Sequence, residues 1–230
     1  MPARAPAVVA LLAGLLSLAA PAAAERVSGP ARVVDGDTLE VSGRKVRLLG
    51  IDAPERDQPC EDATGRPYAC GAAAHEALAA LTEGRRVTCE GPGEDPWGRL
   101  VARCAAEGRD LGAALVRAGV ALAYERFDDA YLPQQAAAKA EGAGLWAGRF
   151  EPPWEHRAAE RQAERAAALA RAPADPDCRI KGNVSRNGRL YHLPEWRSWT
   201  ATRIDEAKGE RWFCSEAEAR AAGWSPAFGN

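Results

Sequence analysis

The chain of 230 residues lacks an excess of basic charge. It holds 30 lysine and arginine residues against 32 aspartate and glutamate residues, a formal net charge of −2 at pH 7. Proteins that grip duplex nucleic acid over a broad surface neutralise many phosphates with basic side chains. The composition therefore argues against a long basic groove, and any phosphate chemistry must depend on a few local charges.

Long hydrophobic runs are also scarce. One uncharged run rich in alanine, leucine and valine covers residues 5–20 behind Arg4, and small residues follow it at 21–24. The run is short for a membrane span and no second one follows it, so we interpret residues 1–24 as a signal peptide. No cysteine lies near the cleavage site, which argues against a lipid anchor. We expect an exported monomer, periplasmic or extracellular, with no membrane attachment after leader removal.

Cysteine is infrequent, and all six cysteines follow the leader. An even number in an exported chain favours disulfides over free thiols. Sequence order suggests three pairs, although six cysteines allow other connectivities: Cys60–Cys70 within a loop, Cys89–Cys104 between neighbouring strands, and Cys178–Cys214 in the tail. Buried reduced cysteines are the alternative if the leader interpretation is wrong.

Short β-rich runs alternate with turns from residue 27 to about residue 101. Between the first two runs, Asp35-Gly36-Asp37 is a hairpin signal. The run at 45–49 is dense enough in apolar residues to suggest a strand that is buried on both faces. Five strands in an antiparallel meander can close as an OB-type β-barrel; we expect them at 32–34, 38–41, 45–49, 86–89 and 100–104.

Helices are expected between and after these strands, which gives an α+β fold. Their ranges are 72–82, 111–118, the latter capped by Asp110, and 132–143. Pro152-Pro153 then breaks the chain, and a helix polar nearly all round follows at 154–171, typical of a solvated spacer. We expect a barrel-plus-helices domain at 25–150, a helical linker at 151–176 and a small C-terminal module at 177–230.

Three short segments carry residues with a common chemistry. They are Asp35-Gly36-Asp37-Thr38, the segment from Arg47 to Glu55 that reads RLLGIDAPE, and Asp95-Pro96-Trp97-Gly98-Arg99. Their carboxylates suit a hard divalent cation, and their two guanidinium groups can match a phosphate bidentately. Each segment alone is weak evidence, but together they supply what metal-assisted phosphodiester hydrolysis requires.

At these residues the chain resembles the staphylococcal-nuclease-like (thermonuclease) family, over residues 27–146. The resemblance implies a five-stranded OB-type barrel with three helices and a calcium-dependent endonuclease. It also implies in-line attack of water on phosphorus, with a 3′-phosphate as product. We expect single-stranded or frayed DNA and RNA as substrates, because the barrel groove and a single phosphate clamp suit flexible strands.

The first two segments supply the expected metal site and the expected base. Asp37 and Asp52 are the proposed Ca²⁺ ligands, with the main-chain carbonyl of Ala53 as a third. Asp35 is less certain, because the first Asp of an Asp-Gly turn is often a turn former. Glu55, which Pro54 holds on extended backbone, is expected to orient or deprotonate the attacking water.

Two arginines and one tyrosine complete the expected site. Arg47 and Arg99 would clamp the phosphate and stabilise the charge that grows on its oxygens. Tyr124 falls where the resemblance places an aromatic hydroxyl beside the bound nucleotide, although a barrel-edge aromatic is nearly as good an interpretation. A second tyrosine expected two residues later is replaced by Arg126.

The tail leaves more than one interpretation open. It resembles a small module found behind bacterial nuclease domains and, more distantly, the zinc-binding module of alkylation-repair proteins. That zinc site needs four cysteines, so a Cys178–Cys214 disulfide is favoured over zinc held by these cysteines and His192. Several of its aromatic and basic residues could stack on nucleic acid or form a small core: Tyr191, Trp196, Arg197, Trp199 and Arg203.

Two other functions are compatible with the sequence. The first is a non-catalytic nucleic-acid-binding module on the same fold, against which the joint presence of Arg47, Glu55 and Arg99 argues. The second is an envelope-binding protein whose tail engages cell-wall or protein partners.

Overall fold

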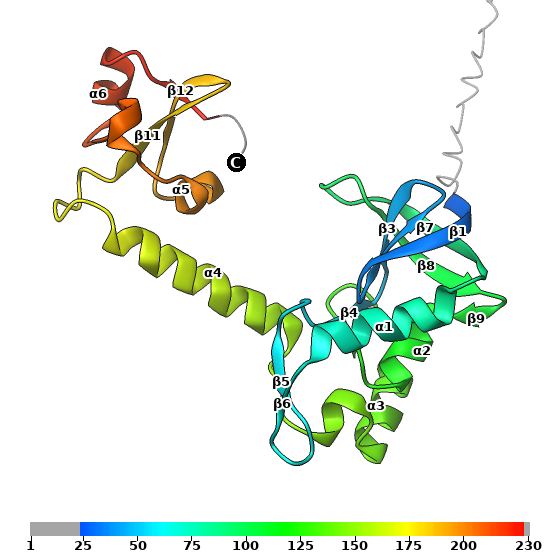
Figure 1. The fold of residues 1–230 in the computed structure, drawn as a ribbon. Coiled ribbons are helices and arrows are strands. Elements are labelled where there is room, and N and C mark those ends of the chain that lie inside the picture. The colour runs from blue at the N-terminus through cyan, green and yellow to red at the C-terminus, as the bar shows by residue number, and fades with distance from the viewer. Residues whose placement is uncertain (1–23, 228–230) are drawn as a thin grey trace, which may run out of the picture. The chain divides into compact units, whose positions relative to one another are not determined.

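The structure is a computed structural model that describes residues 24–227 (Figure 1). The predicted signal peptide therefore lies outside the described residues except for Ala24. The chain divides into two compact units, the first ending at Phe150 and the second beginning at Glu151. Within residues 24–227, no helix combines the length and the apolar character needed to cross a bilayer.

A closed barrel of five strands forms the centre of the first unit. The strand order is β3-β2-β1-β7-β8, and a parallel pairing of β3 with β8 closes the ring. All other pairings in the ring are antiparallel. The predicted OB-type α+β class is confirmed. The strands are β1 (Glu25–Asp35), β2 (Thr38–Val41), β3 (Arg44–Leu48), β7 (Arg86–Glu94) and β8 (Leu100–Ala106), with β9 (Arg109–Asp110) added beside β8.

Strand β3 differs from its prediction in one respect. Val46 and Leu48 are buried in the barrel core, but Lys45 is exposed and Arg47 is only half-buried. The expectation of a strand buried on both faces is therefore wrong. A barrel strand presents alternate residues to the core and to the outside, and this alternation places Arg47 on the outer face.

Three helices pack beside the barrel, as predicted. They are α1 (Cys70–Thr82), α2 (Leu111–Arg117) and α3 (Leu132–Glu141), followed by the 3₁₀ turn η1 (Gly144–Ala147). Asp110 caps α2 by accepting a hydrogen bond from the Ala113 N–H at 2.8 Å, the role that its side chain predicts. Gly142 ends α3 in the left-handed conformation, which a glycine adopts without strain.

Two short antiparallel pairs lie outside the barrel. Strand β4 (Ile51–Asp52) pairs with β10 (Leu122–Ala123), so that Asp52 lies opposite Leu122. Strand β5 (Pro59–Glu61) pairs with β6 (Pro67–Ala69) immediately before α1. The first of these pairs joins the middle of the RLLGIDAPE segment to the chain that precedes Tyr124.

The second unit begins with the long helix α4 (Pro153–Ala170), close to its predicted range. A four-stranded sheet follows in the order β13-β11-β12-β14. Tyr191 and Trp199 are fully buried, so these two aromatics belong to the interior of the module. The remaining elements are β11 (Ile180–Ser185), β12 (Gly188–His192), α5 (Arg197–Ala201), η2 (Glu206–Lys208), β13 (Arg211–Phe213), α6 (Glu216–Ala221) and β14 (Ser225–Pro226).

Three disulfides join the pairs that sequence order suggests: Cys60–Cys70, Cys89–Cys104 and Cys178–Cys214. Cys89 and Cys104 are direct partners in the β7–β8 register. His192 is hydrogen-bonded through both ring nitrogens, to Ser198 and Asn183, so the alternative zinc site in the tail is not formed. Three disulfides indicate an oxidising compartment.

Candidate active site

Arg47 joins the two acidic residues of the predicted metal site. Its Nη1 donates to Asp37 Oδ1 at 2.5 Å, and its Nη2 donates to Asp52 Oδ1 at 2.8 Å. Asp52 is fully buried and Asp37 is 4% exposed, whereas the Arg47 side chain is 21% exposed. Three residues from the β1–β2 hairpin, β3 and β4 therefore meet at one place.

The hairpin between β1 and β2 sets the position of Asp37. The Asp37 N–H donates to Asp35 Oδ1 at 3.2 Å, so Asp35 acts here as a turn former. The Ala53 N–H donates to Asp37 Oδ2 at 3.2 Å. Burial raises the pKa of Asp37 and the nearby Asp35 adds to this, while the Arg47 guanidinium and the Ala53 N–H act to lower it.

Asp37 and Asp52 offer carboxylate oxygens, which are ligands that a hard divalent cation prefers. Calcium takes about six to eight oxygen ligands, including carboxylates, main-chain carbonyls and water. Over residues 24–227, no three His, Cys, Asp or Glu side chains gather into a group that could hold a metal. Asp37 and Asp52 would thus be the protein carboxylates of such a site, and the Ala53 carbonyl and water would have to supply further oxygens. Arg47 is the positive group between these carboxylates in the structure.

The loop that carries Glu55 is fixed by two neighbours that the sequence did not single out, Gln58 and Gly71, and by the predicted Cys60–Cys70 disulfide. The Gln58 side-chain Oε1 accepts the Glu55 N–H at 3.2 Å, and the Gln58 N–H donates to the Glu55 carbonyl at 2.9 Å. Gly71 approaches so closely that an added Cβ would lie 1.8 Å from that carbonyl. The Cys60–Cys70 disulfide ties the same loop to the start of α1. Of these contacts, only the disulfide could be predicted from the sequence, from its two cysteines.

Arg99 is held by the turn that precedes it. Asp95 Oδ1 accepts the N–H groups of Trp97 and Arg99, and Asp95 Oδ2 accepts the Arg99 Nε–H at 2.8 Å. Burial acts to raise the pKa of Asp95, but these hydrogen bonds outweigh it and leave that pKa below its usual value. The Arg99 guanidinium carbon lies 5.5 Å from the centre of the Trp97 ring, and Trp97 is 68% exposed.

The barrel register relates the two arginines. Arg47 is paired with Val101 in the parallel β3–β8 ladder. Arg99 lies two residues before Val101, and residues two apart on an extended chain point to the same side. Arg47 therefore faces outward at the closing pair of the barrel, and Arg99 lies in the turn immediately before β8.

Tyr124 lies beside the site through backbone pairing. It follows β10, whose Leu122 is paired with Asp52, and its N–H donates to the Gly50 carbonyl at 2.9 Å. The Tyr124 and Phe127 rings meet edge to face with centroids 4.9 Å apart. Phe127 is 66% exposed, so an aromatic side chain is present near the position where a second tyrosine was expected.

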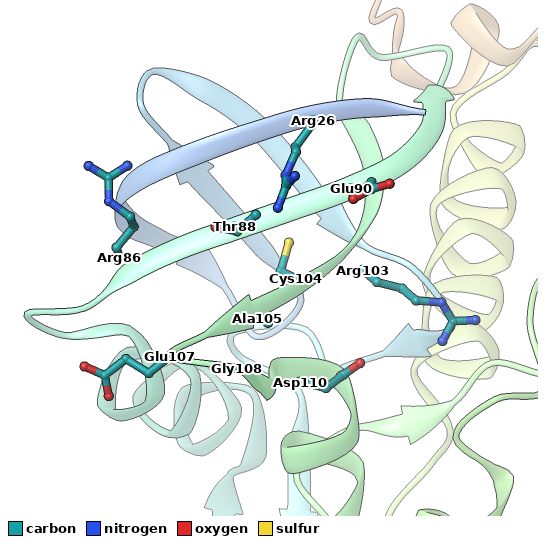
Figure 2. A pocket seen from close by; sticks show the side chains of 10 residues that line it. All are labelled: Arg26, Arg86, Thr88, Glu90, Arg103, Cys104, Ala105, Glu107, Gly108 and Asp110. Carbon is teal, nitrogen blue, oxygen red and sulfur yellow. The ribbon is translucent and has the colours of Figure 1, made fainter. Parts of the chain in front are cut away.

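A separate hollow of about 510 Å³ lies on the outside of β1, β7 and β8 (Figure 2). Basic and acidic side chains alternate around it, and several are already engaged. Glu107 is paired with Arg85, Arg103 with Asp128, and Asp110 accepts the Tyr131 hydroxyl. None of the predicted site residues lines this hollow, so its charges give no reason to move the candidate site there.

Comparison with known proteins identifies a family and several relatives. Residues 45–148 match the family model described as staphylococcal nuclease homologue. The succinoglycan biosynthesis protein ExoI of Rhizobium meliloti is 41% identical over 155 residues, covering 66% of this chain and 79% of that protein. An uncharacterized endonuclease of Escherichia coli O157:H7 is 35% identical over 131 residues, covering 54% of this chain and 79% of that protein.

The match to a third relative covers a larger share of that relative's length. Protein ParB of Escherichia coli is 33% identical over 162 residues, covering 62% of this chain and 85% of that protein. The matched family region contains Arg47, Asp52, Glu55, Arg99 and Tyr124, and the hairpin of Asp37 precedes it by a few residues. By fold, site and relatives, the chain belongs to the family of staphylococcal nuclease homologues.

Proposed function

We propose that this protein is an exported, calcium-dependent endonuclease that hydrolyses phosphodiester bonds of DNA and RNA and acts as a monomer. The observation that carries the proposal is the contact of Arg47 with both Asp37 and Asp52, beside the loop of Glu55. Membership of the nuclease family and the endonuclease name of the Escherichia coli O157:H7 relative support it. The three disulfides support an oxidising, exported location.

Each side chain has a distinct part in the proposed reaction. Arg47 and Arg99 bind the scissile phosphate through forked N–H groups and stabilise the charge that develops on its oxygens. Glu55 orients the attacking water and accepts its proton. Calcium, when bound by Asp37 and Asp52, supplies positive charge to the phosphate and makes the water more acidic.

The preference for single-stranded or frayed substrate follows from the small charged area. Two arginines can clamp one phosphate, but the chain as a whole is acidic, and duplex binding over a broad surface needs many basic contacts. Tyr124 and the exposed rings of Trp97 and Phe127 offer faces on which unpaired bases can stack.

Cleavage assays on the purified chain test this proposal. Labelled single-stranded DNA, duplex DNA and RNA are incubated with calcium, with magnesium, or with a chelator in excess. We expect cleavage with calcium, none with the chelator, and faster cleavage of the single strands. Binding of single-stranded DNA without cleavage under any of these conditions would favour the non-catalytic alternative.

A further inference from the structure

The second unit contains a cavity of about 320 Å³ that has no part in the site above. It lies where the end of α4 meets the sheet of the module, and Ala168 from α4 and Thr202 after α5 contribute to its wall. Its charged lining consists of Arg171, Lys181, Arg203 and Glu206, and Trp212 adds an aromatic side chain. Three cationic groups thus share one small space with one carboxylate.

Lys181 is the buried member of this group. It is only 3% exposed, and its Nζ donates to the main-chain carbonyls of Trp199 and Thr202 at 2.8 and 2.6 Å. The ammonium also lies 3.9 Å from the centre of the Trp199 ring. Among residues 24–227, no carboxylate lies within ion-pair distance of Lys181. These neutral partners stabilise the charge only in part.

The surroundings of Lys181 increase the cost of its charge. Burial, together with the nearby positive charge of Arg171, lowers the pKa of Lys181 to about 8. Arg171 and Arg203 are exposed at the rim, and neither forms an ion pair within the described part of the chain. An arrangement of like charges around a cavity is unfavourable by itself, and an anion placed among them would relieve the repulsion.

We propose that this cavity binds a phosphate group of single-stranded nucleic acid, which makes the C-terminal module a second substrate-holding site. Arg171 and Arg203 would contact the phosphate at the rim, with Lys181 as the fixed charge beneath it. Trp212, which is half-buried at the wall, would stack on a neighbouring base. The choice of nucleic acid as the ligand rests on the proposed function. The excess of positive charge around the cavity is seen in the structure and does not depend on the proposed function.

Two features favour a strand over a free inorganic anion. The volume is near the lower end of the range of about 300–1,000 Å³ for small-molecule sites, which is more space than a bare phosphate needs. The combination of basic side chains with an aromatic face is also typical of proteins that bind single strands without sequence preference. A site of this kind would hold a flexible strand on the protein between successive cleavages.

Fluorescence anisotropy of the full chain tests the inference. The probe is a labelled ten-nucleotide single-stranded DNA, titrated in excess chelator so that cleavage does not interfere. The test variant carries Arg171→Gln and Arg203→Gln, two exposed positions where the fold is under little constraint. Arg186→Gln is the matched control, because Arg186 is an exposed arginine of the same module that does not line the cavity.

We expect the double variant to bind about tenfold more weakly at low salt, and the control to bind like the wild type. Each phosphate contact on a single strand contributes about 0.7 to the slope of log affinity against log salt. Losing two contacts should therefore make the slope shallower by about 1.4. An oligonucleotide of the same length that lacks its bases should also bind more weakly than the complete one.

The outcomes separate this inference from the proposed function. A chain that cleaves DNA with calcium, but whose double variant keeps wild-type affinity and salt slope, would overturn the inference alone. A chain that binds through these arginines but cleaves nothing would overturn the proposed function alone. Equal affinity for the complete and the base-free oligonucleotide would overturn the assignment to nucleic acid and leave a site for phosphate only.

Discussion

Asp95 binds Arg99 through the Nε–H of the guanidinium, at 2.8 Å, and not through its terminal nitrogens. Within residues 24–227, those terminal nitrogens have no hydrogen-bond partner, and the Arg99 side chain is 23% exposed. An arginine fixed in this way is oriented and still has two donors for a bidentate contact. The pair would thus orient Arg99 for the proposed phosphate contact before substrate binds.

Asp95→Asn should lower kcat about tenfold and raise KM. The amide keeps an oxygen for the turn N–H groups but loses the charged partner of Arg99 Nε, so the guanidinium is oriented less tightly. Steady-state cleavage of single-stranded DNA measures both constants. Asp62→Asn is a matched control, because Asp62 accepts two N–H groups and the Nε–H of Arg66 in the same pattern. Equal effects of both variants would show that Asp95 has only a structural role.

Asp52→Asn should lower calcium affinity by at least about tenfold while the barrel stays folded. The substitution preserves shape and an acceptor for Arg47 but removes one of the two carboxylates that suit a hard cation. Calorimetric titration with calcium gives the affinity, and circular dichroism checks the fold. Asp57→Asn, at an exposed acid five residues further along the chain, should bind calcium like the wild type. Unchanged calcium binding by Asp52→Asn would exclude this carboxylate as a ligand.

Removing the Cys89–Cys104 disulfide should destabilise the barrel by about 3 kcal/mol, the loop-entropy value for a separation near that of these two residues. The sequence separation is 15, and both cysteines are buried. They join β7 to β8, the strands on either side of the Arg99 turn. A Cys89→Ala, Cys104→Ala variant should therefore melt at a lower temperature and cleave more slowly. Removing Cys178–Cys214 in the same way should leave the barrel transition in place. An unchanged melting temperature of the barrel in the Cys89→Ala, Cys104→Ala variant would contradict this prediction.

The lowered pKa of Lys181 predicts that the stability of the second unit depends on pH. Its pKa is about 8 in the folded chain and 10.5 without the fold, so the unfolded state binds more protons between these values. The free energy of unfolding should therefore rise as the pH increases from 8 to about 10.5. Thermal melting followed by tryptophan fluorescence measures this rise. The Lys181→Met variant should lose it, whereas Lys208→Met, at an exposed ion pair with Asp205, should keep it. Parallel pH curves for the wild type and Lys181→Met would show that Lys181 is not the group responsible.

Much of the fold could be predicted because its signals are local. The Asp110 cap and the Asp-Gly hairpin each act within a few residues, and the corresponding helix and turn form where the sequence places them. The burial of the strand at 45–49 was misjudged, because apolar density does not show which residues face a barrel interior. Arg47 is the residue of that strand whose side chain faces outward, and its neighbours are fixed only when β3 pairs with β8 to close the barrel.

The site residues could be named from the sequence, but their contacts could not. The Arg47 bridge joins the β1–β2 hairpin, which lies beside β3 in the barrel, to β4, which pairs with β10 in a separate two-stranded sheet. Gly71 contributes by having no side chain where the Glu55 backbone passes, and a close approach of this kind leaves no periodic signal. The Lys181 cavity was likewise hidden, because its charges come from three separated segments: the end of α4, β11 and the chain after α5.

We propose that Arg47, between Asp37 and Asp52, is a phosphate-binding group of a calcium-dependent nuclease. The most direct test of this proposal is single-turnover cleavage of labelled single-stranded DNA by the wild type and by Arg47→Lys, each with calcium and with excess chelator. We predict calcium-dependent cleavage by the wild type and a loss of about a hundredfold or more in Arg47→Lys, because an ammonium keeps the charge without the fork. Cleavage by the wild type in excess chelator, or an Arg47→Lys rate within a few-fold of the wild type, would contradict it.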